Sequence, residues 1–264
     1  MSAGRHVVSF LAALAATIVV ACTDVPTDAD AVSAIQFSSL PAPSIVGGDS
    51  LRDSTGAPVR LSAIAFNFEG DEIAGAPFTF FSPDTLIEIS EDGFVTSIAP
   101  RDTPAKIFAT LGSLQSRGVD LPIVARPDTV RADGAPDTLR FGATGSDAAT
   151  VRTSDTVRVA VEHRVTGTTT FAAVPFRLVD FRLVHGGIEI VPGDSTVAHL
   201  VDENGRASVI DTTGTDGRAF RFLRVRRASL AASLDSIIVL ITTRVERGLV
   251  PGAPVRIVLP VRQP

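Results

Sequence analysis

Residues 157–162 read Val-Arg-Val-Ala-Val-Glu, and residues 255–262 read Val-Arg-Ile-Val-Leu-Pro-Val-Arg. In both stretches apolar side chains recur at every second position. A period of two is that of a β-strand with one face on a core and the other on solvent. Because Pro260 lacks a backbone N–H, the second stretch is predicted to lie at the edge of a sheet. Together the two stretches favour an all-β fold.

Other stretches extend this pattern along the chain. Residues 237–241 form a continuous apolar run, which is typical of a central strand. Phe220 and Phe222 share one face of a strand, but the apolar residues that follow them share the other face. This slip predicts a bulge or a strand end, with both phenylalanines at core positions. Frequent Gly, Pro, Asp and Ser between the apolar stretches indicates short strands and turns rather than helices.

The second half of the chain, residues 127–264, is predicted to form one β-sandwich after a hinge at Arg126-Pro127. Residues 128–150 either add strands to it or form a linker. The relevant stretches are Val174-Pro175-Phe176-Arg177-Leu178-Val179 and Thr215-Asp216-Gly217-Arg218-Ala219, and residues 202–207 look like a second copy of the turn at 215–219. These stretches resemble bacterial Ig-like domains of group 1, the invasin and intimin type.

Residues 31–126 also contain strand-like stretches every 8–12 residues, a spacing that predicts a sandwich. Four motifs resemble the bacterial Ig-like domain of group 2: Gly48-Asp49-Ser50-Leu51 leading to 61–63, Phe78-Thr79-Phe80-Phe81-Ser82, Gly93-Phe94-Val95-Thr96-Ser97-Ile98 and Ile107-Phe108-Ala109-Thr110. That family often has Trp where this chain has Phe80 or Phe81. The resemblances imply two tandem Ig-like antiparallel β-sandwiches.

The N-terminus resembles a lipoprotein export signal. A short basic start at Arg5 precedes a weakly polar-to-apolar run that ends in Val19-Val20-Ala21-Cys22. The run is short for a spanning helix. The last four residues resemble the bacterial lipobox, which implies cleavage of a signal peptide (1–21) and a lipid on Cys22, the only cysteine. Residues 22–30 would then form a tether, and Thr23 in place of Asp favours the outer membrane or cell surface over the inner membrane.

Charge is distributed unevenly along the 264 residues, whose formal net charge is -5. Residues 23–126 carry 14 acidic and 6 basic side chains, net -8, and residues 127–264 carry 15 and 17, net +2. The first half should therefore repel anionic surfaces and nucleic acid. A single cysteine also excludes an internal disulfide, so the domains must fold by core packing.

Candidate catalytic and metal sites are weak. Gly48-Asp49-Ser50-Leu51 spells the block of the GDSL esterases, but no Asp-x-x-His follows, so a turn is predicted. His163, His185 and His199 are dispersed, which favours surface or half-buried strand positions over a zinc site. Acidic residues at 202–204 and 211–216 could bind calcium, but solvated turns account for them better. We expect no enzyme activity, no cofactor and no metal.

Five arginines form the densest basic cluster: Arg218, Arg221, Arg224, Arg226 and Arg227. They are the predicted ligand-binding residues, with a solvated strand face as the alternative. Beyond the membrane itself, the expected partner is a protein or an anionic glycan of the cell envelope or of another cell, not nucleic acid. The predicted function is non-enzymatic adhesion or cell-envelope interaction. A structural spacer, a subunit of an envelope complex and an accessory module of a secreted hydrolase stay open as alternatives.

Overall fold

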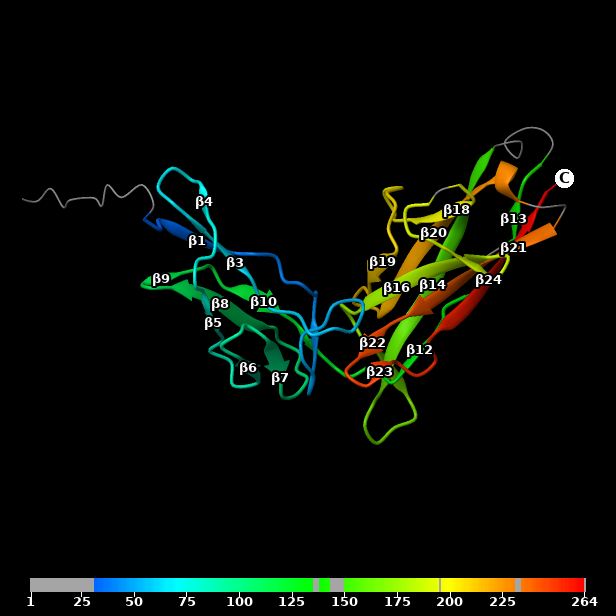
Figure 1. Ribbon diagram of the computed structural model, residues 1–264. Helices are drawn as coiled ribbons and strands as arrows, with labels where there is room; N and C mark the ends of the chain where they lie inside the picture. The colour runs from blue at the N-terminus through cyan, green and yellow to red at the C-terminus, as the bar shows by residue number, and fades with distance from the viewer. Residues whose placement is uncertain (1–30, 135–137, 143–149, 195, 231–233, 264) are drawn as a thin grey trace, which may run out of the picture.

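The computed structural model describes residues 31–134, 138–142, 150–194, 196–230 and 234–263. The chain forms two β-rich bodies that lie side by side (Figure 1). Apart from strands, the regular elements in these ranges are limited to one short 3-10 helix, Arg227–Ser229. The all-β class is thus confirmed. Within the described ranges, no helix is long and apolar enough to cross a membrane. The predicted signal peptide, Cys22 and the tether lie outside the described residues.

The first body has small sheets around one core. Its strands are β1 (Ala34–Phe37), β2 (Ile45–Val46), β3 (Ala63–Phe66), β4 (Glu72–Ile73), β5 (Thr79–Phe81), β6 (Ile87–Ile89), β7 (Val95–Ser97), β8 (Ala105–Leu111), β9 (Leu114–Gln115), β10 (Val119–Leu121) and β11 (Ile123–Val124). They form a β1–β3–β4 sheet, a β10–β8–β5 sheet with β9 beside β8, a β6–β7 pair and a parallel β2–β11 pair. Phe37, Leu51 and Ile107 are among the buried residues of its core.

Phe80 and Phe81 lie on opposite faces of β5. Phe80 packs against the first core, with its ring centroid 5.7 Å from that of Phe37 in an edge-to-face arrangement. Phe81 is exposed and stacks on Phe108 at 5.3 Å. Of the two candidates for the position that resembles the tryptophan of group 2 domains, Phe80 therefore contributes to the core.

The second body is a sandwich of two larger sheets. Its strands are β12 (Thr129–Ala132), β13 (Leu139–Arg140), β14 (Val151–Arg164), β15 (Phe171–Ala173), β16 (Leu178–His185), β17 (Ile188–Ile190), β18 (Ala198–Val201), β19 (Ile210–Thr212), β20 (Arg218–Arg226), β21 (Leu234–Thr242), β22 (Arg244–Val245), β23 (Gly248–Leu249) and β24 (Val255–Arg262). One sheet has the order β12–β14–β20–β18, with β15 beside β14, and the other β13–β24–β21–β16–β17, with β19 beside β16. Phe181, Leu223, Ile237 and Leu259 are buried between them.

The structure confirms some sequence predictions about this body and contradicts two. Residues 237–241 lie in β21, between β24 and β16, as predicted for a central strand. Val130 and Leu139 are buried in the second core, so the described part of 128–150 contributes strands to the sandwich. The predicted edge position of β24 is wrong because β13 pairs with it in parallel. That pairing covers Val261 and Arg262, so Pro260 lies just before the short ladder begins.

The predicted phase slip near Phe220 is also wrong. Along β20 the burial alternates regularly, and it places Ala219, Arg221, Leu223 and Val225 inside. Phe220 and Phe222 are half-buried on the outer face, where their rings meet edge-to-face at 5.8 Å. The irregularity instead lies in the partner strand β14, whose pairing shifts between Thr153 and Thr156. The sequence pattern failed because an arginine, not a phenylalanine, occupies the inward position.

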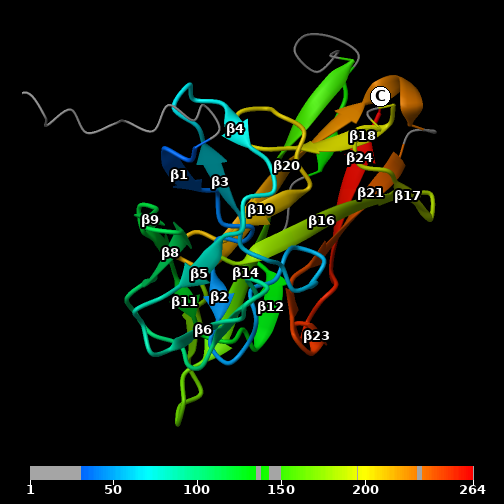
Figure 2. The same ribbon diagram turned by 60° about the vertical axis from the view of Figure 1, so that its left-hand side comes forward.

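The two bodies meet through hydrogen bonds between residues far apart in the sequence. Ser44 Oγ donates to the carbonyl oxygen of Phe176 at 2.6 Å, and the Glu246 N–H donates to Asp49 Oδ2 at 2.9 Å. Val46 of β2 packs in the second core. Figure 2 shows the same junction region turned by 60°. These hydrogen bonds join residues before and after the predicted domain boundary at 126/127. The boundary itself stays a prediction.

Phe176 adopts a backbone conformation that is unusual for a residue with a side chain. Its φ is 57°, in the left-handed region, which a bulky residue occupies only when its surroundings hold it there. Its N–H donates to the carbonyl oxygen of Thr213, and the buried Thr213 Oγ1 accepts from the Arg177 N–H at 2.8 Å. These bonds fix the bend that presents the Phe176 carbonyl to Ser44.

Candidate functional site

The five predicted arginines do not form one patch. Arg218, Arg224 and Arg226 project from the outer face of β20, whereas Arg221 projects into the sandwich. Arg227 starts the 3-10 helix, and its Nη1 donates to the carbonyl oxygen of Gly142 at 3.1 Å. Arg221 is separated from the other arginines of β20 because successive side chains of a strand point to opposite faces.

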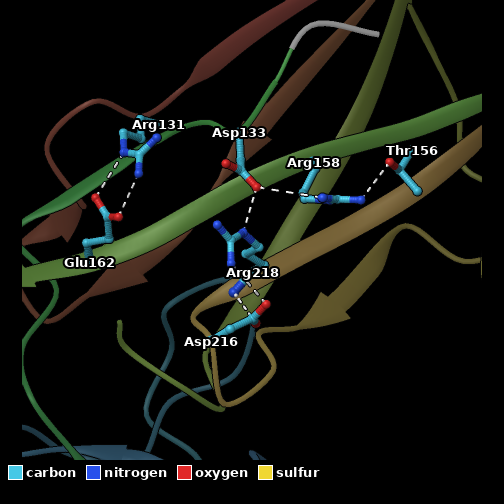
Figure 3. Close-up of polar contacts among 7 residues, drawn as sticks. All are labelled: Arg131, Asp133, Thr156, Arg158, Glu162, Asp216 and Arg218. Carbon is cyan, nitrogen blue, oxygen red and sulfur yellow. Dashed lines mark hydrogen bonds and ion pairs between the residues drawn. The ribbon is translucent and has the colours of Figure 1, made fainter. Parts of the chain in front are cut away.

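Arg218 belongs to an ion-pair network on the outer face of the β12–β14–β20 sheet (Figure 3). Its Nε donates to Asp133 Oδ2 at 2.7 Å, and its Nη1 lies 3.3 Å from Asp216 Oδ2. The hydrogen bond to Asp133, followed by that to Asp216, raises the pKa of the Arg218 guanidinium above its usual value. Beside it, Arg131 makes two hydrogen bonds to Glu162, at 3.0 and 2.8 Å. Arg218 is therefore already neutralised by acidic neighbours.

Arg221 is committed to the interior of the fold. Its Nη1 donates to the carbonyl oxygen of Phe220 and lies 2.9 Å from Asp211 Oδ1. Its Nη2 donates to Ser208 Oγ at 3.0 Å and to the carbonyl oxygen of Ile210. The guanidinium also lies 6.0 Å from the centroid of the Phe181 ring. Buried polar groups with this many partners stabilise the fold, so we assign Arg221 a structural role. Its buried Nε has no partner among the described residues, and its side chain also lines a hollow with Arg218.

Arg224 and Arg226 lie beside His199 at a surface hollow of about 480 Å³. Arg224 is directly opposite His199 in the β18–β20 register. Val151, Gly193 and Ala207 complete the lining of this hollow, which we call the basic pocket. Arg224 makes no hydrogen bond or ion pair with another residue of the described ranges, in contrast to Arg218 and Arg221. The basic pocket thus has a cationic side chain without a counter-charge.

The surroundings of His199 disfavour the protonated form of its imidazole. Partial burial, and after it the positive charges of Arg224 and Arg226, lower the pKa of the imidazole below its usual value. Its Nδ1 atom is buried and has no hydrogen-bond partner among the described residues. The two arginine charges are the part of this pKa shift that reflects positive potential at the basic pocket, and such a potential favours an incoming anion.

A second hollow of about 210 Å³ lies on the other side of β18, between the two sheets. It shares Gly193, His199 and Ala207 with the basic pocket. Its other lining residues are mostly apolar and include Phe181, Leu183, Ile190, Val191, Leu200 and Val209. We call it the apolar pocket. Its acidic lining residues have partners: Glu189 pairs with Arg182 at 3.8 Å, and Asp194 accepts from Thr196.

The Gly48-Asp49-Ser50-Leu51 block has a structural role. Asp49 is buried, and its carboxylate accepts hydrogen bonds from the Ser50 N–H, Arg52 Nε and the Glu246 N–H. Ser50 Oγ lies 3.5 Å from Thr96 Oγ1. Within the described ranges, no histidine forms a hydrogen bond with Ser50 Oγ. The predicted turn is confirmed by the left-handed φ of 76° at Gly48.

The remaining sequence candidates are turns and isolated histidines. Asp202 Oδ1 accepts from the N–H groups of Asn204 and Arg206, and Asp216 Oδ1 accepts from the Arg218 N–H, so both carboxylates close their own turns. No group of three or more potential metal ligands occurs among the described residues. All three histidines are half-buried, as predicted, and His185 Nε2 lies 2.7 Å from Asp235 Oδ2.

Sequence reasoning missed His199 as a site residue. Its strand position was predicted, but its neighbours come from 25 residues further along the chain, at Arg224, through the β18–β20 pairing. The local sequence around His199 is that of an ordinary solvent-facing strand, so it does not indicate a site. The pairing register, not the local sequence, brings the three basic side chains together.

No family model matches this chain, and no curated protein matches it. Similar solved structures include domains 4–9 of the surface layer protein SbsC (14% identity, TM-score 0.30, covering 88% of this chain and 30% of that one). They also include the Yersinia pseudotuberculosis adhesin InvE (12%, 0.28, 87% and 58%) and the tandem Ig repeats of Dlar (9%, 0.23, 89% and 100%). The chain spans less than two thirds of the first two proteins. At these TM-scores the comparisons assign neither a family nor a function to this chain.

Proposed function

We propose that the chain is an exported, lipid-anchored protein whose Ig-like sandwiches present a non-enzymatic binding surface for adhesion or cell-envelope interaction. The lipobox-like residues 19–22 and the strand-rich segments after them support this proposal. So does the structural role of Asp49, which removes the esterase-like block as a source of catalysis. The first body follows the proposed anchor in sequence, so it stands nearer the membrane than the second.

The observation that carries the binding role is Arg224 in the basic pocket, which has no counter-charge among the described residues. β20 runs from Arg218, near the residue 173–177 bend that faces the first body, to Arg226 at the far end (Figure 1). The basic pocket therefore lies at the end of the second body that is remote from the first body and from the proposed anchor. A charged site in this position meets molecules outside the anchoring membrane.

We expect that cells displaying the full-length protein capture fluorescent envelope fragments, and that Arg224→Ser reduces capture by about tenfold. Loss of a charge contact worth about 1.4 kcal/mol corresponds to that factor. Flow cytometry at fixed ionic strength measures the effect. Increasing salt should reduce capture by the wild-type protein as well.

Arg256→Ser is the matched control, because Arg256 is exposed on the outer face of the other sheet and the substitution changes the net charge equally. Equal loss with both variants would indicate a general charge effect and contradict a binding role for the basic pocket. Capture that depends on neither arginine would favour a structural spacer.

Cys22→Ala is expected to abolish membrane attachment or leave unprocessed precursor, since the thiol is the proposed site of the lipid. Membrane fractionation with metabolic labelling by a fatty acid analogue measures both results. Thr23→Ala is the control, because it retains the thiol and should keep the label. A Cys22→Ala protein that fractionates and migrates like the wild type would show that no lipid is attached there.

The alternative from a different class is an accessory module of a secreted hydrolase, or a hydrolase itself. The chain contains no Trp or Tyr, so it lacks the side chains that sugar-stacking platforms most often use. Turnover of an esterase or glycosidase substrate that Ser50→Ala abolishes would favour the alternative over the binding role.

A further inference from the structure

The basic pocket and the apolar pocket lie on opposite sides of one edge strand, β18. They meet at His199, Gly193 and Ala207, which line both. Inward-facing Ala198 and Leu200 belong to the apolar side, and His199 between them belongs to the basic side. A molecule that bridges the edge of the sandwich at this point would therefore touch two chemically different surfaces.

The two surfaces match the two ends of an amphiphile. The basic pocket offers Arg224, which has no counter-charge among the described residues, and the imidazole of His199 beside it. Its lining includes no acidic side chain within the part of the chain that the structure describes. The apolar pocket offers Phe181, Leu183 and Leu200, which are otherwise core residues. Charge on one side and apolar surface on the other define the chemistry of the occupant.

Exposed aliphatic side chains lie at the apolar pocket. Val191 lines the apolar pocket and is 69% exposed, and nearby Ile188 of β17 is 74% exposed. Because these aliphatic side chains are exposed to water, the hydrophobic effect favours the binding of a ligand that covers them. The volume of about 210 Å³ is smaller than that of pockets for drug-sized ligands, and this limits the occupant to a single slender chain.

We infer that this end of the second body binds a single-chain anionic amphiphile, with its carboxylate or phosphate head at Arg224, Arg226 and His199 and its apolar chain in the apolar pocket. The inference rests on the proposed function, because it names the ligand class of the same binding surface. It commits to a free amphiphile monomer rather than to a bilayer surface. No covalent step is involved.

The test uses the full-length lipoprotein in phosphatidylcholine nanodiscs and a photoreactive dodecanoate. Crosslinked peptides identified by mass spectrometry should include residues of β16 and β18 that line the apolar pocket. Unlabelled dodecanoate and dodecyl phosphate should compete, and dodecyltrimethylammonium should not. Across octanoate, decanoate and dodecanoate, competition should strengthen by about fourfold per methylene until the pocket is full.

Two substitutions separate the two halves of the site. Arg224→Ser should reduce labelling by about tenfold. Ala207→Trp places a large side chain where the two pockets meet, at an exposed position that the fold tolerates, and should block labelling. Arg256→Ser should label like the wild type, and circular dichroism confirms that each variant is folded.

Three results would overturn the inference: equal competition by the cationic amphiphile, unchanged labelling of Arg224→Ser, or crosslinks outside the two pockets. Competition by phosphatidylglycerol nanodiscs but not by monomeric dodecanoate would also reject it, in favour of a bilayer surface. If labelling fails while envelope capture still depends on Arg224, the ligand class is wrong but the proposed function stands. If capture also fails, the proposed function is wrong.

Discussion

Asp49→Ala is expected to lower the free energy of unfolding by about 3 kcal/mol, because it removes one partner of a buried charged network. The Asp49 side chain is 2% exposed, and its carboxylate accepts from Arg52 Nε at 2.8 Å. It also accepts from the Glu246 N–H at 2.9 Å, across the junction of the two bodies. Alanine leaves both donors without an acceptor in a buried place. Urea unfolding followed by circular dichroism measures the loss, since the chain has no Trp or Tyr for fluorescence.

Arg177 increases the expected cost of the Asp49 substitution. Its side chain is buried, and its Nη2 donates to the carbonyl oxygen of Arg244 at 2.8 Å. Burial lowers the pKa of the Arg177 guanidinium to about 10, and the charge of Asp49 acts in the opposite direction. The guanidinium therefore stays charged at neutral pH. Without Asp49 it would lose the carboxylate that partly compensates its burial.

Ser50→Ala is the control for Asp49→Ala within the same four-residue block. Ser50 Oγ has one distant hydroxyl contact, to Thr96 at 3.5 Å, so its removal should change the free energy of unfolding by less than about 0.5 kcal/mol. If the serine substitution destabilises the protein as much as the aspartate substitution, the network around Asp49 does not hold the junction. An unchanged unfolding curve for Asp49→Ala would also contradict the stabilising role of the Asp49 network.

The strand content and many turns could be predicted from the sequence because they depend on local physics. The alternation at 157–161 places Val157, Val159 and Val161 in the second core, as a period of two requires. The chain turns at Glu91-Asp92-Gly93, where turn-forming residues stand between two strands and Gly93 has a left-handed φ of 81°. Local pattern and local conformation agree at these positions.

The junction and the basic pocket could not be predicted, because both depend on pairs that are distant in sequence. Asp49 and Glu246 are separated by 197 positions, and nothing in either local sequence indicates the other. His199 meets Arg224 through the register of two antiparallel strands, and a shift of one residue would place the histidine elsewhere. A single sequence specifies such contacts only through the complete fold.

The prediction of which face of β20 points inward was wrong for a different reason. In Phe220-Arg221-Phe222 the hydrophobic pattern favours burying the phenylalanines. The fold instead buries Arg221, because Asp211, Ser208 and two backbone carbonyl groups pair with its two Nη groups inside the edge of the sandwich, although its Nε has no partner among the described residues. The phenylalanines remain half-covered on the outer face and pack against each other. A buried arginine with enough partners thus overrides the burial preference that the pattern suggested.

Arg221→Met is accordingly expected to destabilise the protein by about 3 kcal/mol, whereas Arg224→Met, three residues away, should change stability by less than about 0.5 kcal/mol. The Arg221 side chain is 8% exposed, and its loss leaves Asp211 Oδ1 and the Ile210 carbonyl oxygen without that donor. Methionine keeps most of the apolar volume, so the loss reports the polar contacts rather than a cavity. Urea unfolding of both variants by circular dichroism measures the difference.

The same pair of variants separates a folding role from a binding role. Arg224→Met should retain wild-type stability and lose envelope capture, because its guanidinium lies in the basic pocket without a counter-charge. Arg221→Met should show reduced stability, and below its unfolding transition it should retain the capture that depends on Arg224. Equal stability of the two variants would mean that the buried contacts of Arg221 contribute little. Loss of capture by a folded Arg221→Met protein would return Arg221 to the ligand-binding residues that the basic sequence cluster predicted.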